Sequence, residues 1–287
     1  MNRLALASLP LLLGAQGCTA LLAPGEAQCE SASDCAARGF ADATCVDSVC
    51  VAPTVVDAVW GCLGHVIKPA PDKTQKVALD IQLILAFDKS PVTTAVIDVC
   101  DKLDVTCTGN NPDYPKGISP TKTGAVKLKV VQGFDGFVRV TDPAVVDTRV
   151  YVGRPLMADP RFKDIRLLRP SDYAILATLA GLEVDPTRGT AILASVDCGG
   201  ETVGGVRFRS PNADAKSSEF YLVNQAPMTP PGTTATDSDG FGGFFNLVAK
   251  SVVARAYVAK GDAFIGESSF QVLPNTISFV LIGPTPH

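Results

Sequence analysis

The sequence predicts a mainly β fold with two tandem Greek-key-type β-sandwich domains, joined by a short helix and preceded by a small disulfide-rich segment. Apolar residues alternate with polar ones over much of the chain, as expected for half-buried strands. Gly, Pro, Asp and Ser turns separate these stretches at the close spacing typical of a sandwich. Charged residues make up 19% of the chain, below the roughly 25% usual in soluble domains, and hydrophobic residues reach 46%.

The N-terminus has the pattern of an export signal. Arg3 precedes an apolar stretch from Leu4 to Leu13, and the small residue Gly17 precedes Cys18. This pattern resembles a bacterial lipoprotein signal, in which the cysteine becomes the acylated first residue of the mature protein. The resemblance implies that residues 1–17 are a signal peptide, that Cys18 is lipidated and that residues 18–28 are a tether. Ordinary cleavage without a lipid is the alternative, because Ala15 stands where the lipoprotein pattern prefers leucine.

Charge and hydropathy limit the expected partners. The remaining chain has no second apolar stretch of the roughly 20 residues that a membrane helix needs. We therefore expect the membrane as a partner only through the N-terminal lipid. The formal net charge is -4, with both signs dispersed, so nucleic acid is not expected to bind.

The nine cysteines suggest an oxidised, exported protein. Four of them lie within residues 29–50, where apolar residues are too few to form a core, so crosslinks are expected to order this small knot. Bound zinc is the alternative, although the segment has no paired C-x2-C motif, and four cysteines allow three disulfide connectivities. Residues 51–58 follow as a linker. With Cys18 set aside as the lipidated residue, the disulfide candidates are Cys29, Cys35, Cys45, Cys50, Cys62, Cys100, Cys107 and Cys198.

Residues 59–168 are predicted to form the first sandwich and residues 187–287 the second. Between them, residues 169–186 contain a helix, with Ser171 as its expected N-terminal cap and Gly181 as its end. The strands expected in the first domain are 77–87, 95–99, 125–130 and 134–141. Those expected in the second are 189–196, 205–209, 219–224, 244–248, 252–258, 264–273 and 277–282.

The two β regions share one order of features, which predicts an internal repeat. In each region a strand and a turn lead into a second strand, and a later Thr-rich turn with glycine precedes two more strands. The second region resembles the carboxypeptidase regulatory-like, or transthyretin-like, β-sandwich family. The motif residues that carry this resemblance are Asp197, Gly200, Gly205, Val206, Thr236, Gly240, Gly243, Phe244 and Leu247. The whole arrangement also looks like envelope lipoproteins of gliding bacteria such as myxobacteria, which implies an outer-membrane location and an acyl group such as palmitate.

Signatures of catalysis are sparse. The chain has two histidines, His65 and His287, and lacks G-x-S-x-G, H-E-x-x-H and P-loop motifs. The Asp237–Gly240 segment begins like a calcium loop, but Val248 stands where an EF-hand needs glutamate, so a turn is preferred. The acidic loop 98–104 is likewise read as solvated, and Trp60 as a packing residue rather than a ligand platform. No metal or cofactor is expected.

These observations favour a non-enzymatic, membrane-tethered envelope lipoprotein with structural or spacer β-sandwich modules. One alternative is a surface module that binds a carbohydrate or a peptide, with an envelope protein or a carbohydrate as partner. Exposure of Tyr114, Tyr221 or Phe241 would favour this alternative. A hydrolase is the third hypothesis and needs a cleft that brings two carboxylates, or His65 and a nucleophile, together.

Overall fold

The computed structural model describes residues 29–38, 44–46, 48–51, 59–160 and 164–286. The chain divides into two compact units, Met1–Val55 and Val56–His287, and each is described by itself. The proposed signal peptide and Cys18 lie outside the described residues.

The first unit contains a short helix and a two-stranded antiparallel sheet. Helix α1 (Ala32–Ala37) begins after Ser31, where the Asp34 carboxylate accepts hydrogen bonds from the backbone N–H groups of Ser31 and Glu30 at 2.8 and 2.9 Å. This places a negative charge in the first turn, where it compensates unpaired N–H groups. Strands β1 (Thr44–Val46) and β2 (Val49–Val51) form the sheet.

The second unit is mainly β, which confirms the predicted fold class. Helix α2 (Pro170–Leu179) lies between two sets of strands that we call the first half and the second half. The first half contains β3 (Lys76–Leu85), β4 (Val96–Asp101), β5 (Ala125–Val131), β6 (Gly136–Thr141), β7 (Thr148–Tyr151) and β8 (Asp164–Leu167). The second half contains β9 (Arg188–Ser195), β10 (Val206–Arg209), β11 (Ser218–Val223), β12 (Ala226–Met228), β13 (Phe241–Val248), β14 (Ser251–Val258), β15 (Phe264–Gln271) and β16 (Ile277–Ile282).

The two halves repeat one pattern of strand pairing. In the first half, β3 pairs antiparallel with β5 and parallel with β8, while β6 pairs antiparallel with β4 and β7. In the second half, β9 pairs antiparallel with β13 and parallel with β16, while β14 pairs antiparallel with β10 and β15. The predicted internal repeat is therefore confirmed in topology. The β11–β12 hairpin is an addition to the second half, on the edge of β13.

The two halves also share a sheet. Strand β7 of the first half pairs in parallel with β16 of the second, so that one eight-stranded sheet runs in the order β12-β11-β13-β9-β16-β7-β6-β4. The other two sheets, β5-β3-β8 and β10-β14-β15, have three strands each. This continuity was not predicted, because parallel pairing of strands more than a hundred residues apart has no local sequence signal.

Each face of the long sheet carries a different cover. On one face, Phe279 and Val150 pack with Leu83 of the sheet β5-β3-β8 in a largely aliphatic core. On the opposite face, Tyr151 and Leu193 pack with residues of the sheet β10-β14-β15 in a core that is richer in aromatic residues. The central strands β9 and β16 are therefore buried on both faces, as their continuous apolar sequences require.

Helix α2 covers the part of the first face that the sheet β5-β3-β8 leaves open, over β9, β11, β13 and β16. The Tyr173 hydroxyl forms a 2.6 Å hydrogen bond with the Thr190 hydroxyl of β9. The predicted cap at Ser171 was wrong: Arg169 is the N-cap residue and Pro170 begins the helix, because a proline at this position loses no helical hydrogen bond. Gly181 ends the helix as predicted, with φ of +73°.

Candidate functional site

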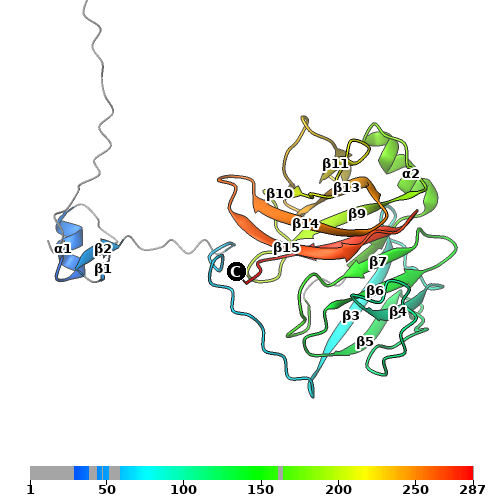
Figure 1. Cartoon of the computed structure of the whole chain (residues 1–287), viewed down its shortest axis with the longest axis horizontal. Helices are drawn as coiled ribbons and strands as arrows, with labels where there is room; N and C mark the ends of the chain where they lie inside the picture. The colour runs from blue at the N-terminus through cyan, green and yellow to red at the C-terminus, as the bar shows by residue number, and fades with distance from the viewer. Residues whose placement is uncertain (1–28, 39–43, 47, 52–58, 161–163, 287) are drawn as a thin grey trace, which may run out of the picture. The chain divides into compact units, whose positions relative to one another are not determined.

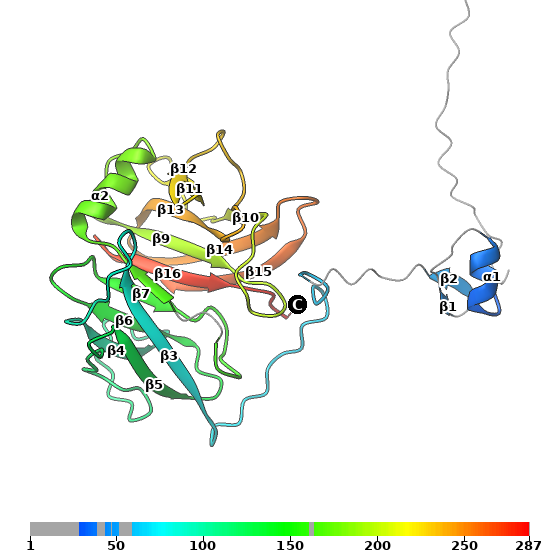
Figure 2. The same ribbon diagram turned by 180° about the vertical axis from the view of Figure 1, so that it is seen from behind.

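A cleft of about 480 Å³ lies at the carboxyl ends of the three neighbouring parallel strands β9, β16 and β7. Its walls come from residues 66–69, the loop 152–160 after β7, residues 196–200 after β9 and the C-terminal residues 281–286. In Figures 1 and 2, the C mark lies beside the first coloured segment of the second unit, and α2 lies at the opposite end. The cleft therefore lies at the end of the second unit that holds its first described residues.

The local sequence explains why these segments form walls. Prolines 69, 155, 160, 284 and 286 lie in these segments, and proline lacks the N–H group that helices and inner strands need. Gly153 has φ of +75°, and a Cβ atom there would lie 1.8 Å from the carbonyl oxygen of Leu281. Only glycine allows the loop after β7 to approach β16 so closely. The Asp159 carboxylate holds the far end of this loop by accepting the backbone N–H of Ala78 at 2.8 Å.

The lining of the cleft suits binding better than acid–base chemistry. Most of its surface is apolar, with Ile67 87% exposed at the rim. Asp159 and Arg154 are the ionisable side chains among the described residues that line it. A pair of carboxylates or a histidine beside a nucleophile, which hydrolysis would need, does not occur in this described lining.

A disulfide fastens the incoming chain beside the cleft. Cys62 is bonded to Cys198, which follows β9, across a sequence separation of 136. The backbone N–H of Cys198 also donates to the carbonyl oxygen of Val59 at 3.1 Å. Trp60 is partly buried and packs against the aromatic core, in agreement with its interpretation as a packing residue. His65 follows in the same segment and is exposed.

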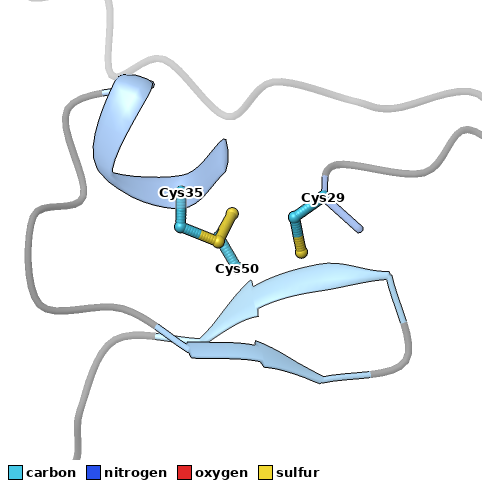
Figure 3. Close-up of side chains that lie close together, drawn as sticks. All are labelled: Cys29, Cys35 and Cys50. Atoms are coloured by element: carbon cyan, nitrogen blue, oxygen red, sulfur yellow. A yellow bond between two sulfur atoms is a disulfide. The ribbon is translucent and has the colours of Figure 1, made fainter. Parts of the chain in front are cut away.

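The first unit pairs its four cysteines as Cys29–Cys45 and Cys35–Cys50. The sulfur atoms of Cys29, Cys35 and Cys50 lie within 4.8 Å of one another, which is close enough for shared metal ligation (Figure 3). All three are bonded in disulfides, however, and a metal would need deprotonated thiolates. Of the two interpretations drawn from the sequence, the structure contains the disulfides.

The last disulfide joins Cys100 at the end of β4 to Cys107 in the following loop. Both cysteines were predicted as disulfide candidates, but Lys116, whose Nζ lies 2.9 Å from the Cys107 sulfur, was not predicted as their neighbour. No sequence pattern connects a lysine to cysteines 9 and 16 residues away. Arg149 on β7 was also not predicted; it is 3% exposed and lies 5.0 Å from the centre of the Phe137 ring.

The other acidic candidates are turns. One Asp237 carboxylate oxygen accepts the backbone N–H of Asp239 at 3.0 Å, and the other accepts that of Asn224 at 2.9 Å. These bonds belong to the turn that was preferred from the sequence. In the acidic loop 98–104, Asp104 accepts the backbone N–H of Gly109 at 2.6 Å, which lowers the pKa of this carboxyl group.

The three aromatic residues named for ligand binding do not form an exposed cluster. Tyr221 is fully buried, and burial together with the neighbouring Glu219 raises the pKa of its hydroxyl group. Phe241 is buried in the core of the first face, and Tyr114 packs edge-on against Phe134 with 5.2 Å between ring centres. The aromatic platform that would favour a carbohydrate ligand is therefore not built from these residues.

Known proteins provide only distant likenesses. No protein-family model and no curated protein matches the chain. Among solved structures, the chain is similar to the Bacillus anthracis TIE protein, at 14% identity and a TM-score of 0.23, covering 72% of this chain and 34% of that one. It therefore spans about a third of that protein. The shaft pilin SpaA from Lactobacillus rhamnosus GG gives 12% identity, a TM-score of 0.23 and coverage of 74% and 98%. BcpA, the major pilin subunit of Bacillus cereus, gives 10% identity, a TM-score of 0.24 and coverage of 74% and 70%.

Proposed function

We propose that the protein is a non-enzymatic lipoprotein of the bacterial cell envelope, anchored in the outer membrane by acyl chains on Cys18. Its second unit acts as a structural or spacer module that stands off the membrane on the segment 18–58. The export-like run that ends at Cys18 supports this proposal. None of the helices in the described part of the chain is long and apolar enough to cross a membrane. The proposed means of attachment is the lipid on Cys18.

The observation that carries the proposal is the Cys62–Cys198 disulfide. A pull on a membrane anchor would reach the second unit at its first described residues. The disulfide transmits this force to the end of β9, a strand that is buried on both faces of the long sheet. Without this bond, the pull would act first on residues 63–75 and on β3, at the start of the first half. A crosslink at this point suits a module held by its N-terminus.

A non-enzymatic role agrees with the chemistry of the cleft. Asp159, the carboxylate in its described lining, is engaged by the backbone of Ala78. His65 is exposed and is not among the described residues that line the cleft. Spacing and attachment need only a stable body, which the cores and disulfides supply.

The anchor can be tested by membrane fractionation of cells that express the full chain. We expect the wild-type protein in the membrane fraction, with a mature N-terminus at Cys18 whose mass includes fatty acyl groups. Cys18→Ser removes the acceptor thiol and should move the protein to the soluble exported fraction, whereas the neighbouring change Ala20→Ser should not. An unmodified mature N-terminus at another residue would disprove the lipid anchor.

The alternative function, ligand binding at the envelope surface, has its best site in the cleft. The apolar lining fits the side chains of an extended peptide better than a sugar, whose hydroxyl groups need polar partners. Ile67→Asp adds a charge at the exposed rim without disturbing a core. If the cleft binds peptides, this variant should lose peptides that the wild-type protein selects from a random library, while the distant exposed change Ile175→Asp should retain them. Failure of the wild-type protein to select any peptide would disprove this alternative.

A further inference from the structure

Lys116 places an ammonium group against the Cys100–Cys107 disulfide. Its Nζ lies 2.9 Å from the Cys107 sulfur and 3.7 Å from the Cys100 sulfur, and donates a 3.0 Å hydrogen bond to the carbonyl oxygen of Cys107. The carbonyl bond holds the ammonium at the crosslink rather than in solvent. A cation in this position stabilises thiolates far more than it stabilises a neutral disulfide.

The other crosslink of the second unit has a different environment. At Cys62–Cys198, the Cys198 sulfur accepts a hydrogen bond from the backbone N–H of Cys62 at 3.1 Å. A neutral N–H stabilises a developing thiolate less than an ammonium does. The two disulfides of one compact unit therefore differ in how well their reduced forms are stabilised.

We propose that Cys100–Cys107 is a site of thiol–disulfide exchange that accepts a dithiol reductant, and that Lys116 is the positioning residue that makes it reducible. The relevant partner is a small dithiol or a protein with a pair of reactive thiols. The Cys62–Cys198 disulfide serves as the stable structural crosslink under the same conditions.

The exchange begins at Cys107, which is 8% exposed between the exposed residues Thr106 and Thr108, whereas Cys100 is fully buried. A thiolate of the dithiol attacks the Cys107 sulfur, the Cys100–Cys107 bond breaks, and Cys100 leaves with the electron pair as a thiolate beside Lys116. The second thiolate of the dithiol then attacks the dithiol sulfur that is bonded to Cys107, and Cys107 leaves as a thiolate. The two cysteines gain two electrons, the dithiol becomes a disulfide, and its two protons are available to the cysteines.

Hydrogen bonds should keep the loop in place after reduction, so that the disulfide can form again. The Asp104 carboxylate accepts the backbone N–H groups of Gly109 and Thr108 at 2.6 and 3.3 Å. Gly117 donates its backbone N–H to the Asp98 carboxylate on β4 at 2.9 Å. These bonds hold both sides of the loop independently of the crosslink. The two thiols therefore stay close after reduction, and an oxidant can restore the disulfide.

Limited reduction of the full mature chain tests the proposal. The oxidised protein is treated with dithiothreitol at neutral pH, quenched at intervals with an alkylating agent and mapped by peptide mass spectrometry. We expect Cys100 and Cys107 to become alkylated before Cys62 and Cys198. Lys116→Met should slow their reduction about tenfold, because the leaving thiolate loses the cation that stabilises it.

Two further variants separate charge from structure. Lys116→Arg keeps the cation and should retain nearly the wild-type rate. Lys102→Met removes another lysine of the same loop, which pairs with Asp135 at 3.1 Å, and should leave the rate unchanged. Thermal melting of each variant checks the fold. Should Lys116→Met fail to fold, the wild-type order of reduction decides. Earlier or equal reduction of Cys62–Cys198, or an unchanged rate in a folded Lys116→Met protein, would overturn the proposal.

Discussion

The two halves of the second unit share a strand topology but differ in the cores that they bury. The core around β3 and β5 is built mostly from valine, leucine and isoleucine, whereas the core around β14 and β15 contains several aromatic rings. Each core also contains side chains from the other half. Phe279 of β16 lies in the aliphatic core, while Phe137 and Tyr151 of β6 and β7 lie in the aromatic one.

This exchange of side chains shows that a repeated topology does not make two independent domains. In an independent two-sheet sandwich, the inner face of each sheet is buried and the outer face is exposed to solvent. Here β7 and β16 join edge to edge, and the faces left over by one half are covered by sheets of the other. We therefore expect the halves to fold and unfold together, and the following experiments test that coupling.

The largest effect is expected from separating the halves. Residues 187–287 alone would lack β7 along β16 and would lose Phe137 and Tyr151 from their core. We expect this fragment to show no cooperative thermal transition, whereas residues 56–287 should unfold in one transition by calorimetry. A dispersed amide NMR spectrum and a sharp transition for the isolated fragment would show that the halves are independent.

The two disulfides of the second unit should differ in how much they stabilise it, because one links distant parts of the chain and the other lies within the first half. Replacing Cys62 and Cys198 by serine opens a crosslink with a sequence separation of 136, while replacing Cys100 and Cys107 opens one with a separation of 7. Chain entropy predicts losses in the free energy of unfolding of about 5 and about 2 kcal/mol, respectively. Urea denaturation measures both. A larger loss from replacing Cys100 and Cys107 than from replacing Cys62 and Cys198 would mean that the long-range crosslink contributes little to stability.

The sequence was sufficient to predict strands whose two faces differ. Lys127 and Lys129 alternate with buried residues along β5, and its predicted span of 125–130 agrees with the observed Ala125–Val131. Strand β7 was missed because its four residues are all buried, which leaves no alternation. Strand β8 was not predicted although its four residues alternate between polar and apolar, and the three-residue β12 was too short to show a period. Helix α1 was not predicted, although Ser31 and Asp34 form a capping pattern at its start.

The candidate site was less predictable than the strands. The cysteines that form disulfides were all named from the sequence, but their partners depend on folding, as for Cys62 and Cys198. The cleft is assembled from four segments that meet only because β9, β16 and β7 run parallel and end together. Lys116 reaches its disulfide across a loop. Contacts of this kind follow from the strand topology, and no local sequence pattern predicts them.

A core substitution can show how far the coupling extends. Phe279 lies on β16 of the second half, is 5% exposed and packs 6.1 Å from Phe241 in the aliphatic core. Phe279→Ala should lower the free energy of unfolding by about 3 to 5 kcal/mol through lost burial and a cavity. The exposed change Ile175→Ala should cost no more than about 0.5 kcal/mol. Hydrogen exchange should accelerate in β3 and β5 as well as in β16. Faster exchange confined to the second half would contradict the coupling.

The smallest effect concerns the outer edge of β15, which occupies the same place in the second half as β7 in the first. The β7 edge is paired with β16, whereas at β15 a side chain substitutes for a neighbouring strand. The Tyr151 hydroxyl donates to the carbonyl oxygen of Gln271 at 3.3 Å and accepts its backbone N–H at 3.2 Å. Tyr151→Phe removes the hydroxyl partner of the Gln271 N–H group, while the carbonyl oxygen keeps its 2.8 Å hydrogen bond from the Ser278 hydroxyl. The variant should cost about 1 kcal/mol, with faster exchange of the Gln271 amide. Tyr114→Phe, in the aliphatic core, should leave that amide unchanged. Equal exchange at Gln271 in both variants would mean that the edge of β15 does not depend on the first half.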